Sequence, residues 1–320
     1  MFNWKKLGKI FDPLEQKDKN WMEIYAQSPN AIVFDNYIRV YFSSRAKADT
    51  NGQFISRLGY IDLDKNNLFN VLKVCENPIL PLGERGTFDE FGTYPVSVIK
   101  DDKKINAYYA GWTRCESVPF NAAIGLATSF DGGNTFKKVG QGPILSYTPN
   151  EPFVLGSPRI KKFNGTYYLW YSAGIQWVKT EDTPQPVYKI RLATSTDGLN
   201  WIKEEKNLIE SVLEENECQA SAEVIYYKEK YHMFFSYRYN LGYREENRGY
   251  RIGYAHSKDL KNWFRDDSKA GIDKSDNGWD NESVSYPSIF ELDNKLYMFY
   301  QGNGIGQNGF GIARLENYKE

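Results

Sequence analysis

Short runs of alternating apolar and polar residues, separated by polar turns, recur along the whole chain. Five longer copies of one pattern stand out, each with a small or aromatic residue, usually a proline next, an apolar run, a turn and a tyrosine-rich run. They begin at Ser28, Tyr94, Ser157, Ser221 and Tyr286, so successive copies are 66, 63, 64 and 65 residues apart. A period of this length indicates a protein built from structural repeats.

Each copy continues with a second alternating run that leads to a Ser-x-Asp turn and an aromatic residue. The three clearest turns read SFDGGNTF (129–136), STDGLNW (195–201) and SKDLKNW (257–263), and a further short strand follows each. Four strands per repeat, joined by tight polar turns, are typical of a propeller blade. We expect Asp131 to accept backbone N–H bonds across its turn and Phe136 to pack between blades.

The fifth copy stops before its fourth strand, and the N-terminal segment WKKLGKIF (4–11) resembles the missing piece, with Trp4 in the place of Trp201 and Trp263. Closing the ring in this way removes exposed sheet edges. The sequence therefore predicts an all-β, five-bladed β-propeller with four antiparallel strands per blade. We expect one domain over 1–320, with blades at about 28–80, 94–145, 157–210, 221–266 and 286–317 plus 4–11.

The composition excludes several classes of protein. Forty Lys and Arg against 41 Asp and Glu leave no basic excess that would indicate nucleic-acid binding. No segment approaches the length of a signal peptide's apolar run or a membrane span, which predicts a cytoplasmic protein without membrane insertion. Three cysteines and two histidines predict neither a disulfide framework nor a zinc site. We expect no cofactor, with a structural Ca²⁺ or a bound anion on the channel axis left open; the oligomeric state is also left open.

Candidate chemistry gathers where the chain enters the first strand of each blade, because these loops of a propeller meet at one mouth of the channel. Every one of the five approaches carries acid, namely Glu23, Asp89, Glu90, Glu151, Glu217, Glu223, Asp280 and Glu282. Carboxylates that converge from different blades suit general acid and base work on a glycosidic bond. We predict Glu217 or Glu223 as the general acid and Glu282 or Asp89 as the opposing carboxylate, with Glu23 and Asp280 binding substrate.

Arginines and aromatic residues form a second group of candidates. Arg45, Arg114 and Arg238 end second strands, while Arg159 lies inside a first strand at the level of Glu223. Two interpretations stay open: Arg159 pairs with Glu223, or the arginines bind a carboxylate or phosphate of an anionic substrate. Aromatic rings stack on sugar faces, and an amide can hydrogen-bond a sugar hydroxyl. The candidates of these two kinds are Tyr94, Trp112, Tyr237, Tyr286 and Asn303.

With five blades, the repeated blade start and the (S/T)xDGxxW turns, the chain resembles the five-bladed propeller glycosidases, namely glycoside hydrolase families 43 and 32 and the mannoside phosphorylases of family 130. The resemblance covers the whole chain and implies sugar chemistry with an Asp/Glu pair. Its last two blades resemble propellers associated with bacterial polysaccharides. Ser28, Ser157 and Ala220 occupy the positions of the family 43 carboxylates, so that catalytic set does not carry over. SFDGGNTF resembles the Asp-box of sialidases, but sialidases have six blades.

These observations predict a carbohydrate-active, glycosidase-like enzyme that cleaves or transfers a glycosidic bond at the channel mouth through paired acids. Its partner would be a saccharide, with an anionic saccharide as an open alternative. Two other functions stay open. One is a sugar-binding propeller without catalysis, and the other is a phosphorylase or glycosyltransferase that uses an anionic sugar donor.

Overall fold

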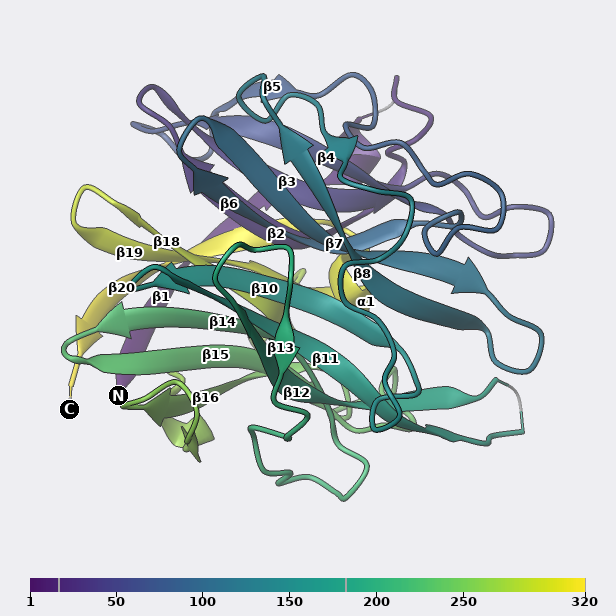
Figure 1. Ribbon diagram of the computed structural model, residues 1–320. Helices are drawn as coiled ribbons and strands as arrows, with labels where there is room; N and C mark the ends of the chain where they lie inside the picture. The colour runs from purple at the N-terminus through teal and green to yellow at the C-terminus, as the bar shows by residue number, and fades with distance from the viewer. Residues whose placement is uncertain (17, 182, 320) are drawn as a thin grey trace.

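The chain forms five antiparallel four-stranded sheets arranged as the blades of a propeller, which confirms the predicted fold (Figure 1). The computed structural model describes residues 1–16, 18–181 and 183–319. The first blade contains β2 (Ile24–Val33), β3 (Tyr37–Arg45), β4 (Ser56–Asp64) and β5 (Val71–Val74). The second contains β6 (Thr93–Asp101), β7 (Lys104–Arg114), β8 (Phe120–Ser129) and β9 (Lys137–Lys138). The third contains β10 (Leu155–Phe163), β11 (Thr166–Val178), β12 (Gln185–Ser195) and β13 (Ile202–Lys203).

The fourth blade contains β14 (Cys218–Tyr227), β15 (Lys230–Arg238), β16 (Arg251–Ser257) and β17 (Phe264–Arg265). The fifth contains β18 (Ser285–Leu292), β19 (Lys295–Gln301), β20 (Phe310–Tyr318) and, as its outer strand, β1 (Phe2–Phe11). β1 pairs with β20 over its whole length, from Phe2 opposite Tyr318 to Phe11 opposite Phe310. The ring is therefore closed by the N-terminal strand as predicted, and the two ends of the chain lie close together (Figure 1).

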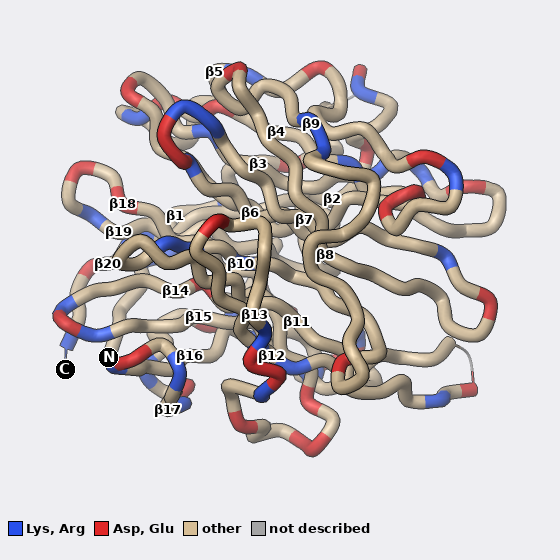
Figure 2. The backbone as a smooth tube through the Cα atoms, viewed as in Figure 1, with Lys and Arg blue, Asp and Glu red and all other residues tan. Residues whose placement is uncertain are grey.

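The described residues also contain three short helical turns: η1 (Pro13–Glu15), η2 (Asp267–Lys269) and α1 (Asn303–Gly306). Within the described ranges, no helix is long and apolar enough to cross a membrane. Lys and Arg residues alternate with Asp and Glu residues along the outer strands and loops, as expected for a net charge of −1 (Figure 2).

A β-bulge at the same place in every first strand explains the repeat that marks the sequence. In each blade the pairing register slips by one residue, because two residues of the first strand lie opposite one residue of the second; these dipeptides begin with Ser28, Tyr94, Ser157, Ser221 and Tyr286. Four of these five residues have a left-handed backbone, with φ between 47° and 56°, and the fifth precedes a cis proline, Pro95. Because bulges turn side chains out of the regular pleat, these residues are re-aimed next to the channel.

Aromatic side chains fill the space between blades, which accounts for their 16% share of the sequence. Phe2 of the fifth blade packs edge-on against Phe234 of the fourth, with ring centroids 4.9 Å apart. Phe136 is buried and packs edge-on against Tyr41 of the first blade, at 5.8 Å. The predicted interblade position of Phe136 is confirmed.

The turn at 129–136 is held by Asp131, as expected from its sequence. Asp131 Oδ1 accepts backbone N–H bonds from Asn134 and Thr135 at 3.0 and 3.1 Å, and the hydroxyls of Ser129 and Thr135 donate to the same carboxylate. Partial burial favours the protonated acid, but these hydrogen bonds outweigh it and lower the pKa of Asp131 to about 2. The motif is thus a device of the fold.

We expect Asp131→Asn to lower the free energy of unfolding at neutral pH by about 1 kcal/mol, since the turn is largely exposed to solvent. A carboxyl with a lowered pKa stabilises the fold above its unfolded pKa, near 3.9, and loses this effect as the pH falls toward its folded pKa. Urea unfolding of both proteins should show their difference shrinking between pH 4 and pH 2, roughly these two limits. A difference that stays constant over that range would contradict this role.

Candidate functional site

A cavity of about 500 Å³ opens where the loops into the first strands meet the ends of the second strands. Its size is typical of a site for a small ligand. All five blades contribute to its wall, and the side chains that bear on its chemistry are Tyr25, Gln27, Arg45, Tyr94, Trp112, Ser157, Tyr188, Arg238, Arg244, Glu245, Tyr250, Glu282 and Tyr286. Of the predicted site residues, the cavity brings together Arg45, Tyr94, Trp112, Arg238, Glu282 and Tyr286.

Three tyrosines form the floor of this cavity. The ring of Tyr286 lies 6.1 Å from that of Tyr94 and 6.0 Å from that of Tyr250, measured between centroids. Trp112 stacks beside Tyr94 at 6.2 Å, and its indole N–H donates to the Tyr94 carbonyl. Tyr94 and Tyr286 reach this place because both are bulge residues. A floor of fixed aromatic rings is suited to stacking on the C–H face of a sugar.

Arg238 is held firmly in the wall by the protein itself. Its Nη1 donates to the carbonyls of Tyr239 and Asn240 at 2.7 and 2.9 Å, and its Nη2 donates to the Tyr188 hydroxyl at 3.0 Å. The hydroxyls of Tyr188 and Tyr250 lie 2.5 Å apart. Burial raises the pKa of both tyrosines, so their hydroxyls stay protonated and available as hydrogen-bond donors.

Two glutamates stand at the rim, on neighbouring loops. Glu282 precedes β18, and Glu245 lies in the connection between β15 and β16; both are exposed, and neither carboxylate is paired within the part of the chain that the structure describes. Asn303 fixes the loop of Glu282, because its side-chain oxygen accepts the N–H of Glu282 at 2.9 Å. Asn303 therefore positions this loop. It was predicted to bind substrate, but it does not line the cavity.

Four of the predicted acids lie elsewhere, in a contact that we call the blade latch. In a blade latch, an acid in the loop before the first strand binds a cation on the fourth strand of the same blade. Asp89 accepts Tyr109 OH at 2.8 Å and pairs with Lys138 at 2.6 Å. Asp280 likewise accepts Tyr300 OH at 3.0 Å and pairs with Lys6 at 2.7 Å.

Glu151 completes the same pattern with Tyr171 at 2.9 Å and Lys203 at 2.5 Å. The acid and the tyrosine are 20 residues apart in all three blades. Burial and the adjacent carboxylate raise the pKa of these tyrosines, so they remain donors. The prediction that Asp89 and Asp280 lie at the channel mouth is wrong. Both acids instead anchor the loop before the first strand to the fourth strand of the same blade.

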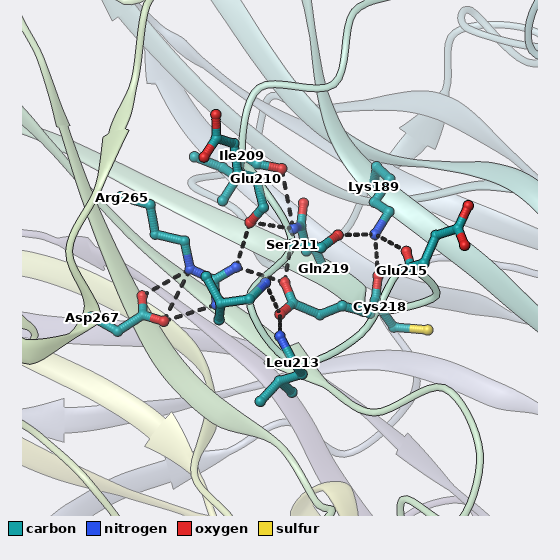
Figure 3. Close-up of polar contacts among 12 residues, drawn as sticks. Lys189, Ile209, Glu210, Ser211, Leu213, Glu215, Cys218, Gln219, Arg265 and Asp267 are labelled. Atoms are coloured by element: carbon teal, nitrogen blue, oxygen red, sulfur yellow. Dashed lines mark hydrogen bonds and ion pairs between the residues drawn. The ribbon is translucent and has the colours of Figure 1, made fainter.

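Glu217 forms the latch of the fourth blade and is completely buried. Its Oε1 pairs with Arg265 of β17 at 2.6 Å and accepts the Gln219 amide at 2.8 Å, while its Oε2 accepts two backbone N–H bonds. Figure 3 shows Arg265 beside Asp267 on one side of this network of contacts and Lys189 on the other side. The predicted general acid is thus enclosed by protein and does not face the cavity.

Arg159 and Glu223 are both buried, and they do not form the ion pair that was one of the two interpretations of Arg159. Glu223 pairs with Lys161, and Arg159 donates to Ser221 Oγ at 2.9 Å. Among the described residues, one oxygen of Glu223 and Nη1 of Arg159 have no hydrogen-bond partner. The attraction of Glu223 still favours the charged guanidinium, although burial as the larger effect lowers the pKa of Arg159.

The remaining predicted residues lie outside the cavity for simple reasons. Tyr237 neighbours Arg238 on β15, and because successive residues of a strand face opposite sides, it packs over Arg265 at 4.5 Å. Arg114 pairs with Asp49 at 2.6 Å. Glu23 accepts the backbone N–H of Lys47, and Glu90 that of Gly86. Within the described ranges, no group of three or more His, Cys, Asp or Glu side chains is placed to hold a metal ion.

Sequence reasoning missed Tyr25, Tyr188, Glu245 and Tyr250. The first three lie outside the repeated motifs, and Tyr250 directly precedes β16. The sequence does not distinguish tyrosines that line the cavity from tyrosines that pack between blades, because both kinds occur on or beside short strands. The length of the 239–250 connection was the available signal for a loop that reaches over the mouth.

The fold is similar to that of solved glycoside hydrolases and related proteins, among them structures described as belonging to families 43, 32 and 130. A solved glycoside hydrolase superposes with a TM-score of 0.77 at 16% identity, covering 100% of this chain and 94% of that one. A structure from the family of mannoside phosphorylases that contains glycoside hydrolases targeting β-1,2 mannosidic linkages gives 0.73 at 15% identity, covering 98% and 94%. No protein-family model matches the chain.

More particularly, the chain belongs to the family of an uncharacterised Mycobacterium tuberculosis protein, Rv1502. The two are 32% identical over 315 residues, which are 98% of this chain and 99% of that protein. A 1,2-β-oligomannan phosphorylase of Thermoanaerobacter sp. is 26% identical over 258 residues, 78% of each chain.

Proposed function

We propose that this protein is a carbohydrate-active enzyme that cleaves or transfers a glycosidic bond in the cavity, with Glu282 as the proton donor. The observation that carries the proposal is a three-tyrosine floor with two glutamates at its edge, Glu245 and Glu282, whose carboxylates have no partner among the described residues. The floor would hold a sugar ring by its apolar face, and the rim would present acid to the bond beside it. The activities of the named relatives support the same class.

Two reactions fit these residues. In hydrolysis, Glu282 donates a proton to the leaving glycosidic oxygen, while Glu245 activates a water or attacks the anomeric carbon. In phosphorolysis, an oxygen of inorganic phosphate attacks the anomeric carbon, the glycosidic C–O bond breaks, and the leaving oxygen takes the proton of Glu282. The products are then a sugar 1-phosphate and a saccharide shortened by one unit.

Phosphorolysis is favoured by the cations beside the two glutamates. Arg238 and Arg244 line the cavity on the fourth blade, next to the loop of Glu282. Such a pair of cations suits a phosphate dianion more than it suits water. A phosphate oxygen also needs no base, so Glu245 would be dispensable in this reaction.

The test is turnover with and without phosphate. Purified protein is incubated with β-1,2-linked manno-oligosaccharides and a panel of other β-linked and α-linked oligosaccharides, and products are separated by anion-exchange chromatography. Phosphate-dependent release of a sugar 1-phosphate would support phosphorolysis, and phosphate-independent release of a monosaccharide would support hydrolysis. Saturable binding without turnover of any panel member would contradict an enzymatic role and support the sugar-binding alternative.

A further inference from the structure

Arg45, at the end of β3, presents its guanidinium fork to the cavity. Its Nε donates to Ser56 Oγ at 2.9 Å, which fixes the plane of the group. Across residues 1–16, 18–181 and 183–319, no carboxylate lies within 4.0 Å of Arg45, and its two terminal nitrogens make no hydrogen bond with protein. These two nitrogens are also not fully buried, so a ligand in the cavity can reach them.

Aromatic rings surround this cation in place of an acid. The guanidinium carbon lies 4.6 Å from the centre of the Tyr25 ring, 5.5 Å from that of Phe54 and 5.6 Å from that of Tyr94. Ring faces stabilise a cation only in part, and a largely desolvated charge without a counter-ion is costly. Burial accordingly lowers the pKa of Arg45. An anion bound at the fork would remove this cost.

Arginines at comparable places in two other blades bind protein groups through their terminal nitrogens. Arg114 ends the second strand of its blade and pairs with Asp49 at 2.6 Å. Arg238 ends the second strand of the fourth blade and donates to two carbonyls and one hydroxyl. Arg45 differs because its two terminal nitrogens make no hydrogen bond to any part of the chain that the structure describes. Two parallel N–H donors match the two oxygens of a carboxylate or phosphate.

The floor separates Arg45 from the proposed proton donor. Tyr94 contacts Arg45 on one side and Tyr286 on the other, and Tyr286 in turn contacts Tyr250. The Tyr250 carbonyl accepts the N–H of Val284, two residues after Glu282. A sugar stacked on Tyr94 and Tyr286 would thus have its reacting bond toward Glu282 and its other end toward Arg45.

We propose that Arg45 binds an anionic substituent carried by the saccharide itself, a carboxylate or a phosphate ester, so that the natural ligand is an acidic sugar. This inference rests on the proposed function in one respect, that the cavity holds a sugar. It goes further by making the substrate anionic at the end away from the reacting bond. The anion at Arg45 is therefore separate from any phosphate that takes part in the reaction beside Glu282.

Binding to matched pairs of sugars tests the proposal. Isothermal titration calorimetry is run with glucuronate against glucose, mannuronate against mannose, and mannose 6-phosphate against mannose. At least one acidic member should bind more tightly than its neutral match, and Arg45→Gln should weaken that binding roughly 10- to 100-fold while leaving the neutral sugar unchanged. Arg45→Lys, which keeps the charge without the fork, should lie between the two. The uronate and phosphate arms show which anion is preferred.

Arg114→Gln is the matched control, since it removes a strand-end arginine outside the cavity and should leave all affinities unchanged. Thermal unfolding of each variant shows whether the fold is retained, and Arg45→Lys keeps the test valid if Arg45→Gln does not fold. Equal affinity within every pair, absence of binding by all acidic members, or an acidic preference that survives Arg45→Gln would overturn the proposal. So would inorganic phosphate that binds through Arg45 and is not displaced by any acidic sugar.

These outcomes are distinct from those of the proposed function. Turnover of neutral oligosaccharides with no acidic preference would remove the role of Arg45 and leave the enzyme intact. Arg45-dependent binding of an acidic sugar without any turnover would support the role of Arg45 and contradict the proposed enzymatic function.

Discussion

Glu282→Gln is expected to lower kcat by about 10²- to 10⁴-fold on whichever saccharide the protein turns over, because the amide cannot donate the proton that the leaving oxygen needs. The carboxylate is exposed and unpaired among the described residues, so the substitution should change neither the fold nor the affinity for the sugar. Steady-state kinetics and thermal unfolding of the same preparations measure both effects. KM should change little, since the proton is transferred only in the transition state.

Glu291→Gln is the control, because Glu291 is an exposed glutamate at the other end of β18 and should have no effect on kcat. Glu245→Gln then separates the two reactions. In hydrolysis it should cost nearly as much as Glu282→Gln, whereas in phosphorolysis its effect should be small. Retention of full activity by Glu282→Gln would exclude this residue as the proton donor and turn attention to Glu245.

The fold could be predicted because one local device recurs at a constant spacing. The first residue of most of these bulges has a left-handed backbone. Serine occupies this position in three copies, as Ser28, Ser157 and Ser221, and so makes the repeat visible in the sequence. The Ser-x-Asp turns gave a second, independent marker of each blade. Since both devices stabilise the backbone, their periodicity reports architecture and not chemistry.

The candidate site was predicted less well because structure and catalysis use the same residue types. Asp89, Glu217 and Asp280 occur at the entry loops as a catalytic acid would, yet each anchors its loop to a cation on the outer strand. The spacing of 20 residues to a tyrosine was present in the sequence and distinguishes Asp89, Glu151 and Asp280 from Glu282, which has Gly302 at that place. Glu245 lies in a connection that the repeat does not describe, so repeat analysis could not find it.

Glu217→Gln is expected to lower the free energy of unfolding by about 3 kcal/mol, because removing one partner of a buried ion pair leaves the other charge uncompensated. Arg265 keeps a second carboxylate, Asp267, at 2.8 Å, which places the effect at the lower end of the usual range. This loss is a large part of the free energy of unfolding of an ordinary protein, which is roughly 5–15 kcal/mol. Urea unfolding followed by tryptophan fluorescence measures the loss.

The same variant decides between a latch and a catalytic acid. As a latch, Glu217 contributes stability alone, so kcat per folded molecule should match that of the unmodified protein at a temperature where both are folded. As a general acid it would contribute to kcat and little to stability, which is the opposite result. Glu215→Gln is the matched control: its carboxylate is exposed two residues away, and its substitution should change the free energy of unfolding by no more than about 0.5 kcal/mol. Loss of stability in Glu217→Gln with unchanged kcat would therefore indicate that the recurring acids of the entry loops stabilise the fold. The acids that take part in the reaction would then be those at the rim of the cavity.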